Sequence, residues 1–140
     1  MKKFLLMLLC VMLLVVLASP AMAADFNLTA TASKTTAYLG DEVTITISTS
    51  GTTPYTSMGF FLQYDTSVFE YKSRSWGAAI VDANTKSFDA DSGKVTAVWE
   101  DASAYAGEMI KITLVVKKAT PGNTTITFSD AACKNENTDF

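Results

Sequence analysis

The sequence predicts an all-β fold, an antiparallel β-sandwich of the jelly-roll kind with about eight to nine strands. Three observations support this prediction. Thr and Val are frequent after the first 23 residues, apolar and polar residues alternate with a period of two, and Gly, Pro, Asn and Asp separate the alternating stretches. No window carries a sustained apolar stripe at helical spacing, so we expect essentially no helix after Ala24.

The first two expected strands each place their apolar residues on one face. In Phe26–Ser33, every second residue from Phe26 to Ala32 is apolar. A second stretch of alternating apolar and polar residues begins at Val43 and continues to about Ser48. The segment YLGDE between them has the composition of a turn. Two neighbouring strands with one apolar face each are typical of a sandwich layer.

Two strands rich in aromatic residues follow, at Ser57–Tyr64 and Val68–Arg74. The residues expected to point inward are Met58, Phe60, Leu62, Tyr64, Phe69 and Tyr71, with Glu70, Lys72 and Arg74 on the opposite face. Phe61 is the exception, because alternation places it on the polar face with Ser57, Gly59 and Gln63. A large apolar side chain on a polar face is a candidate contact for a partner.

The remaining expected strands are Ala79–Val81, Lys86–Phe88, Lys94–Glu100, Glu108–Lys117 and Thr124–Ser129. Trp99 shares its face with Val95 and Ala97, so we expect it in the core. Ile110, Ile112, Leu114 and Val116 give Glu108–Lys117 the clearest alternation of the chain.

Residues 1–23 are predicted to be an export signal. Lys2 and Lys3 precede an uninterrupted apolar run, and Ala21-Met22-Ala23 has the small-x-small form of a cleavage site. The apolar run is short for a membrane span. The mature chain would then be residues 24–140, a single secreted, extracellular domain with no membrane segment after cleavage.

Charge and composition exclude several classes of function. Without Lys2 and Lys3, nine basic residues stand against fourteen acidic ones, a net charge of −5. An acidic domain is a poor partner for nucleic acid or an anionic membrane. The chain has no His, which excludes Ser-His-Asp and Cys-His catalysis, and only Cys133 follows the signal. We expect no enzyme activity, no cofactor and no metal.

The two acidic groupings in the chain do not change this expectation. Glu100 and Asp101 are adjacent in a strand and so point to opposite faces, whereas a hydrolytic pair must converge on one bond. Asp89, Asp91 and Glu100 occupy positions 1, 3 and 12 of an EF-hand count, but Lys94 stands where that loop needs Gly.

Four segments together resemble the cohesin modules of cellulosome scaffold proteins. They are ASKTTAYLGDEVTITIS, MGFFLQYDTSVFEY, SGKVTAVWEDAS and GEMIKITLVVKKATPGNTTITFSD, and the similarity covers nearly all of Phe26–Asp130. The resemblance implies a jelly-roll sandwich that is not an enzyme and that binds dockerin modules of polysaccharide-degrading enzymes. It also implies that the partner contacts the outward face of Ser57–Tyr64, with Glu100 contributing from a later strand.

The sequence departs from this family in two places. The resemblance implies Asn and Asp where this chain has Ser57 and Gly59, so we expect a divergent partner that contacts Ser57, Gly59, Phe61, Gln63 and Glu100. Family members also add a final strand after the segment matching SDAACKNENTDF. We therefore expect the final strand to be missing, which would leave an unpaired edge or a groove.

A carbohydrate-binding module of the same fold is the alternative. Tyr55, Trp76 and Tyr105 lie near expected loops, where aromatic rings stack on plant polysaccharides in such modules. The sequence alone does not show whether these three rings share one exposed face.

Overall fold

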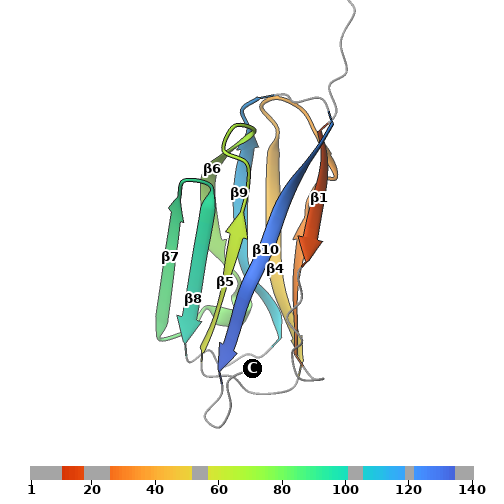
Figure 1. Ribbon diagram of the computed structural model, residues 1–140. Coiled ribbons are helices and arrows are strands. Elements are labelled where there is room, and N and C mark those ends of the chain that lie inside the picture. Colours follow the sequence, from red (N-terminus) through yellow and green to blue (C-terminus); the bar gives the residue numbers. More distant parts are fainter. Residues whose placement is uncertain (1–10, 18–25, 52–56, 101–105, 119–121, 135–140) are drawn as a thin grey trace, which may run out of the picture.

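The computed structural model describes residues 11–17, 26–51, 57–100, 106–118 and 122–134, which form a two-layered β-sandwich (Figure 1). Its elements are β1 (Val11–Leu17), β2 (Phe26–Ala32), β3 (Thr36–Ala37), β4 (Glu42–Gly51), β5 (Ser57–Gln63), β6 (Phe69–Trp76), η1 (Ala78–Ile80), β7 (Thr85–Asp91), β8 (Lys94–Glu100), β9 (Gly107–Val116) and β10 (Gly122–Lys134). The six-stranded sheet has the order β3-β1-β10-β5-β8-β7, and the four-stranded sheet the order β2-β4-β9-β6.

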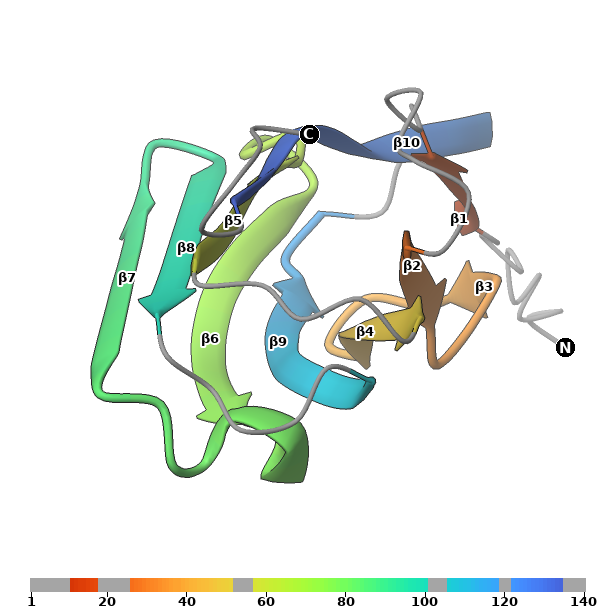
Figure 2. The same cartoon turned by 90° about the horizontal axis from the view of Figure 1, so that it is seen from below.

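The two sheets face one another (Figure 2). The buried apolar side chains lie between them, as the alternation in the sequence predicts. Leu62 and Trp99 from one sheet and Ile45 and Ile112 from the other are fully buried. The ring of Phe60 contacts Trp99 edge-on, with 6.2 Å between ring centroids. Because every second residue of these strands is removed from water, burial of this layer is the main force that stabilises the fold.

The segment 79–81, expected as a short strand, is instead helical: Ala79 and Ile80 lie in the 3-10 helix η1, and Val81 follows as its C-terminal cap. The chain crosses here from β6 of one sheet to β7 of the other, so it has to turn. The Gly77 amide donates to the Met109 carbonyl at 2.6 Å, which holds the turn against β9. Ile80 is buried, whereas Val81 is 72% exposed. Within the described ranges, no helix has the length and apolar content needed to cross a bilayer.

The Arg74 side chain points to the opposite side from the one expected, because β6 contains a β-bulge. The pairing of β6 with β9 shifts between Tyr71 and Ser73, so Arg74 pairs with Ile112 and Trp76 with Ile110. The extra residue reverses the alternation beyond the bulge. The guanidinium of Arg74 therefore lies over the rings of Trp76 and Phe88, at 5.0 and 4.9 Å from their centroids, instead of on the outward face with Glu70.

The apolar run expected to be only an export signal contributes β1 in this structure. β1 pairs in parallel with β10 over Gly122–Phe128 and antiparallel with Thr36 and Ala37 of β3. Seen end-on, β1 lies beside β10 and near β2 of the other layer (Figure 2). Among the described strands every other pairing is antiparallel, and β1 covers the edge of β10 here.

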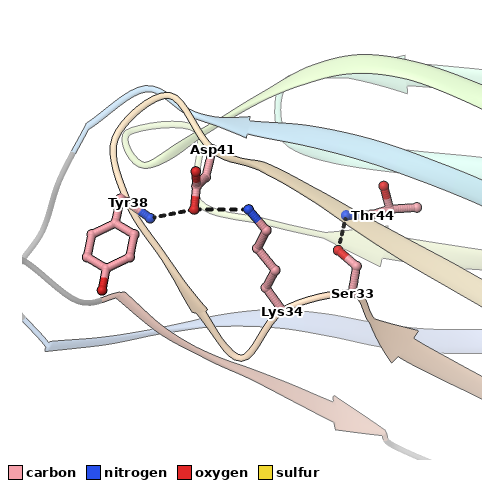
Figure 3. A network of polar contacts seen from close by, with 5 residues as sticks. All are labelled: Ser33, Lys34, Tyr38, Asp41 and Thr44. Atoms are coloured by element: carbon pink, nitrogen blue, oxygen red, sulfur yellow. Dashed lines mark hydrogen bonds and ion pairs between the residues drawn. The ribbon is translucent and has the colours of Figure 1, made fainter.

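The turn between β3 and β4 is held by a polar network (Figure 3). A carboxylate oxygen of Asp41 accepts the Tyr38 backbone N–H at 3.1 Å and lies 3.1 Å from the Lys34 ammonium. The Ser33 hydroxyl accepts the Thr44 backbone N–H at 2.9 Å. These contacts position β3, and the hydrogen bond from the Tyr38 N–H, followed by Lys34, lowers the pKa of Asp41.

Candidate functional site

The outward face of β5 and β8 brings the expected contact residues together. The antiparallel register sets Ser57 opposite Glu100, and the next outward pairs along the two strands are Gly59 with Val98, Phe61 with Thr96 and Gln63 with Lys94. Side chains of paired residues lie on the same side of a sheet. All five residues that the sequence singled out, Ser57, Gly59, Phe61, Gln63 and Glu100, therefore lie on one surface, which we call the β5–β8 face.

Phe61 has the geometry of an outward-facing apolar contact. It is half-buried, whereas its neighbours Phe60 and Leu62 are buried in the core. The Lys94 ammonium lies 3.8 Å from the centroid of the Phe61 ring. A cation at this distance is attracted by the electron-rich ring face, so the two side chains hold one another in place.

Gly59 allows its neighbouring strand to approach closely. A Cβ atom added at Gly59 would lie 3.0 Å from the Ala97 carbonyl oxygen and 3.0 Å from Cγ2 of Val98. The space that a side chain would need at this position is thus partly occupied by Val98. At this position the resemblance implies a polar side chain, whereas the surface here is apolar and is formed by Val98 and the Gly59 backbone.

Charged groups surround this apolar centre. Asp89 and Asp91 of β7 lie opposite Thr96 and Lys94, and Glu100 lies at the other end of β8, opposite Thr85. These carboxylates are exposed. Of the ion pairs within the described residues, none lies on the β5–β8 face. The Asp91 carboxylate accepts the Ser92 hydroxyl at 2.8 Å, and all three carboxylates remain open to solvent on this face.

Sequence reasoning missed several residues of this face, namely Lys94, Thr96 and Val98 of β8 and Asp89 and Asp91 of β7. Alternation could have identified the first three, because Val95, Ala97 and Trp99 were already expected in the core. No local signal identifies the two aspartates as neighbours of Phe61, because the order of strands in the sheet is a property of the whole fold.

The three aromatic residues of the carbohydrate alternative are not brought together in the described part of the chain. Tyr55 and Tyr105 lie outside the described residues. Trp76 is half-buried at the seam between the sheets, with its ring edge-on to Trp99 and to Phe88, each at 6.4 Å between centroids. The bulge in β6 gives Trp76 this orientation, which uses its ring for packing.

The carboxylates of the β7–β8 hairpin do not converge. Asp91 lies next to the turn, opposite Lys94, whereas Glu100 ends β8 at the far end of the hairpin. Among the described residues, no group of three or more acidic or Cys side chains is arranged to hold a metal ion. Asp101, the other member of the adjacent acidic pair, lies outside the described residues.

Comparisons with solved structures identify the fold. A cohesin from Clostridium thermocellum, solved as the Coh-OlpA–Doc918 complex, superposes with a TM-score of 0.70 at 18% identity, covering 83% of this chain and 91% of that one. The sixth cohesin of scaffoldin B from Acetivibrio cellulolyticus, solved with a Cel5 dockerin mutant, gives 0.68 at 18% identity, covering 82% and 90%. A non-cellulosomal cohesin from the archaeon Archaeoglobus fulgidus gives 0.59 at 11% identity, covering 75% and 91%.

The sequence supports the same assignment. No curated protein sequence matches the chain. A family model of the cohesin domain matches residues 28–139, which includes every strand from β4 to β10 and most of β2. The match covers more than half of the chain and all of the β5–β8 face. The chain therefore belongs to the cohesin family.

Proposed function

We propose that this protein is an exported, non-catalytic cohesin module that binds a dockerin-type protein module through the β5–β8 face. Two of the solved cohesins with the same fold were captured in complex with dockerins. The observation that carries the proposal for this chain is the outward, half-buried Phe61 beside Val98, on a face with exposed carboxylates. An apolar centre with a charged rim is the usual composition of a protein–protein interface.

We expect a partner that does not need polar side chains from this protein at the centre of the β5–β8 face. Ser57 offers one hydroxyl and Gly59 no side chain, while Val98 fills the space above Gly59. A polar side chain of the partner placed over Gly59 and Val98 would lose its water where neither residue offers a polar side chain, which is unfavourable. We therefore expect the partner to present an aliphatic or aromatic side chain to Gly59 and Val98.

The proposal is tested by isothermal titration of the protein against a panel of dockerin modules. Phe61→Ala should weaken binding by about 2 kcal/mol, or about thirtyfold, because anchors at the centre of an interface carry much of its binding energy. Its melting temperature should change little, since Phe61 is outside the core. Leu39→Ala is the control, because Leu39 is 63% exposed on the turn before β4 and outside the β5–β8 face.

Soluble cello-oligosaccharides form the second arm of this titration. Saturable binding of these sugars with no dockerin binding would replace the proposal by the carbohydrate-binding alternative. Unchanged dockerin affinity in Phe61→Ala would remove Phe61 from the contact surface.

Export is part of the proposal. Residues 1–23 would direct the chain across the membrane and be removed after Ala23, so that residues 24–140 function outside the cell, where cellulose-degrading assemblies act. The basic start, the apolar run and Ala21-Met22-Ala23 support this. Amino-terminal sequencing of the protein recovered from culture medium should begin at Ala24. Recovery of an intact chain that begins at Met1 would contradict it.

A further inference from the structure

We infer that the mature protein holds an open strand-shaped slot between β3 and β10, and that a lone extended apolar segment of another exported protein fills it in parallel to β10. The inference rests on the proposed removal of residues 1–23. In the structure this slot is occupied by β1, the apolar stretch VMLLVVL of that same export signal. Cleavage after Ala23 takes β1 away.

The slot would have two walls of unpaired backbone. β10 pairs with β5 only from Thr127 onward, so over residues 122–126 its one partner among the described strands is β1. On the other side, the two residues of β3, Thr36 and Ala37, pair with no described strand except β1. Removal of β1 leaves the amides and carbonyls of both walls facing a gap about two strand spacings wide, or about 9.5 Å. Backbone groups left without partners in this way favour the pairing of another strand.

Both walls are held by contacts that do not involve β1. On the β3 side, Asp41 binds the Tyr38 amide and Lys34 (Figure 3). The Gly40 amide donates to the Val116 carbonyl at 2.8 Å, and the Val116 amide donates to the Asp41 carbonyl at 2.9 Å. On the β10 side, Phe128 is buried against the ring of Phe60, with centroids 5.2 Å apart. The slot is therefore expected to persist after β1 has left.

The occupant must be a lone strand. The slot is bounded on both sides at one end, where Thr36 and Ala37 of β3 face β10, so the first two residues of the strand that enters pair with β3 and β10 at once. A folded second copy offers only edge strands such as β2, β6 and β7, each already paired on one side. The segment seated here in this structure defines the chemistry that fits: seven extended residues, all apolar, parallel to β10. Strand addition of this kind obtains affinity from main-chain hydrogen bonds and specificity from alternate side chains.

The test uses the mature protein recovered from the medium and a fluorescent peptide carrying residues 11–17 between flanking lysines. We expect saturable binding in fluorescence anisotropy and a rise in melting temperature. The matched control peptide, Leu14→Pro, should bind at least tenfold more weakly, because Pro removes a ladder hydrogen bond. Binding of both peptides with equal affinity would overturn the inference.

Register is tested by disulfide trapping in a Cys133→Ser background. Leu14 pairs with Thr125, so peptide Leu14→Cys should cross-link to protein Thr125→Cys under mild oxidation. Peptide Val11→Cys pairs with Gly122, three residues away, and should cross-link at least tenfold less. Thr125 is exposed, so this variant should fold normally. Equal yields from the two peptides would show that no defined slot exists.

Three further outcomes would also overturn the inference. One is a mature protein whose amides at 122–126 are protected from hydrogen exchange without any partner. Another is a mature protein that dimerises and excludes the peptide, since a second copy would then be the occupant. The third is an amino-terminus that retains residues 11–17. Phe61→Ala separates the two proposals, because it should weaken dockerin binding and leave peptide binding unchanged.

Discussion

The two outward faces of the sandwich differ in how far their side chains bind one another, although their inward faces are alike. On the four-stranded sheet, outward groups bind one another: the hydroxyls of Thr44 and Thr113 lie 3.3 Å apart, and Lys72 pairs with Glu42. On the six-stranded sheet, the β5–β8 face presents Val98 and Phe61 at its centre.

This difference shows which face is suited to a partner. Hydroxyls and charges that already satisfy one another gain little when water is removed from them. Apolar side chains that remain partly exposed do gain free energy on burial, and exposed carboxylates around them can select the partner. Substitutions in the two sheets and in their turns probe this comparison, from core truncations with the largest expected effect to surface carboxylates with the smallest.

The inward faces should be equally sensitive to truncation. Leu62→Ala in β5 and Ile112→Ala in β9 each remove a fully buried side chain, so each should lower the free energy of unfolding by about 2–5 kcal/mol through lost burial and a cavity. Urea denaturation measures both. A cost below 1 kcal/mol for either one, well under that usual range, would show that its sheet does not share the common core.

Gly59 should tolerate a side chain poorly, unlike outward positions of the other sheet. Gly59→Ala brings a methyl group to 3.0 Å from Val98 Cγ2 and from the Ala97 carbonyl, and should destabilise the fold by about 1–3 kcal/mol. Adding Val98→Ala should recover part of this loss, because only the contact with the backbone carbonyl then remains. A double variant no more stable than Gly59→Ala would show that Val98 does not cause the crowding.

A pair of valines offers a matched test of the two faces. Val98 and Val115 are both half-buried, outward and flanked by strands on either side, one on each sheet. Val98→Ala should weaken the partner by about 1 kcal/mol, or about fivefold, while Val115→Ala should leave affinity unchanged. Titration of both variants against the same dockerin decides it. Equal losses of dockerin affinity in the two variants would show that the partner does not contact the β5–β8 face alone.

Acid should weaken the turn networks through Asp41 and Asp65. The Tyr38 amide and Lys34 lower the pKa of Asp41, and hydrogen bonds from the Ser67 hydroxyl and amide lower that of Asp65. A carboxyl whose pKa is depressed on folding adds stability above its unfolded pKa, near 3.8, and that stability is lost as the pH falls through the folded value.

Asp41→Asn and Asp65→Asn should therefore melt earlier than the native protein at pH 6. The difference in melting temperature should shrink as the pH falls below about 3.8. Asp65 is exposed and Asp41 is partly exposed, so water weakens both interactions and we expect the smallest effect of the series. A difference that stays constant from pH 6 to pH 2 would show that the two networks contribute no pH-dependent stability.

The sequence determined which side chains of β5 and β8 point outward, because the two-residue period is a local property of an extended chain. Phe61 was found on the polar face and Trp99 in the core for this reason alone. Neighbours across strands were less predictable. The resemblance pointed to Glu100, but its position opposite Ser57 depends on a register set by the whole sheet.

Two features were decided by the tertiary structure only. The bulge between Tyr71 and Ser73 turned Arg74 and Trp76 to the seam of the sandwich, and a bulge arises from how two strands pair, not from the residues of one strand. The apolar run at 11–17 reads from the sequence as an export signal, and pairs as β1 only because β3 and β10 present unpaired backbone on either side of it. Side-chain direction along a strand is local, whereas the partners of its backbone groups are fixed by the packing of strands far apart in the chain.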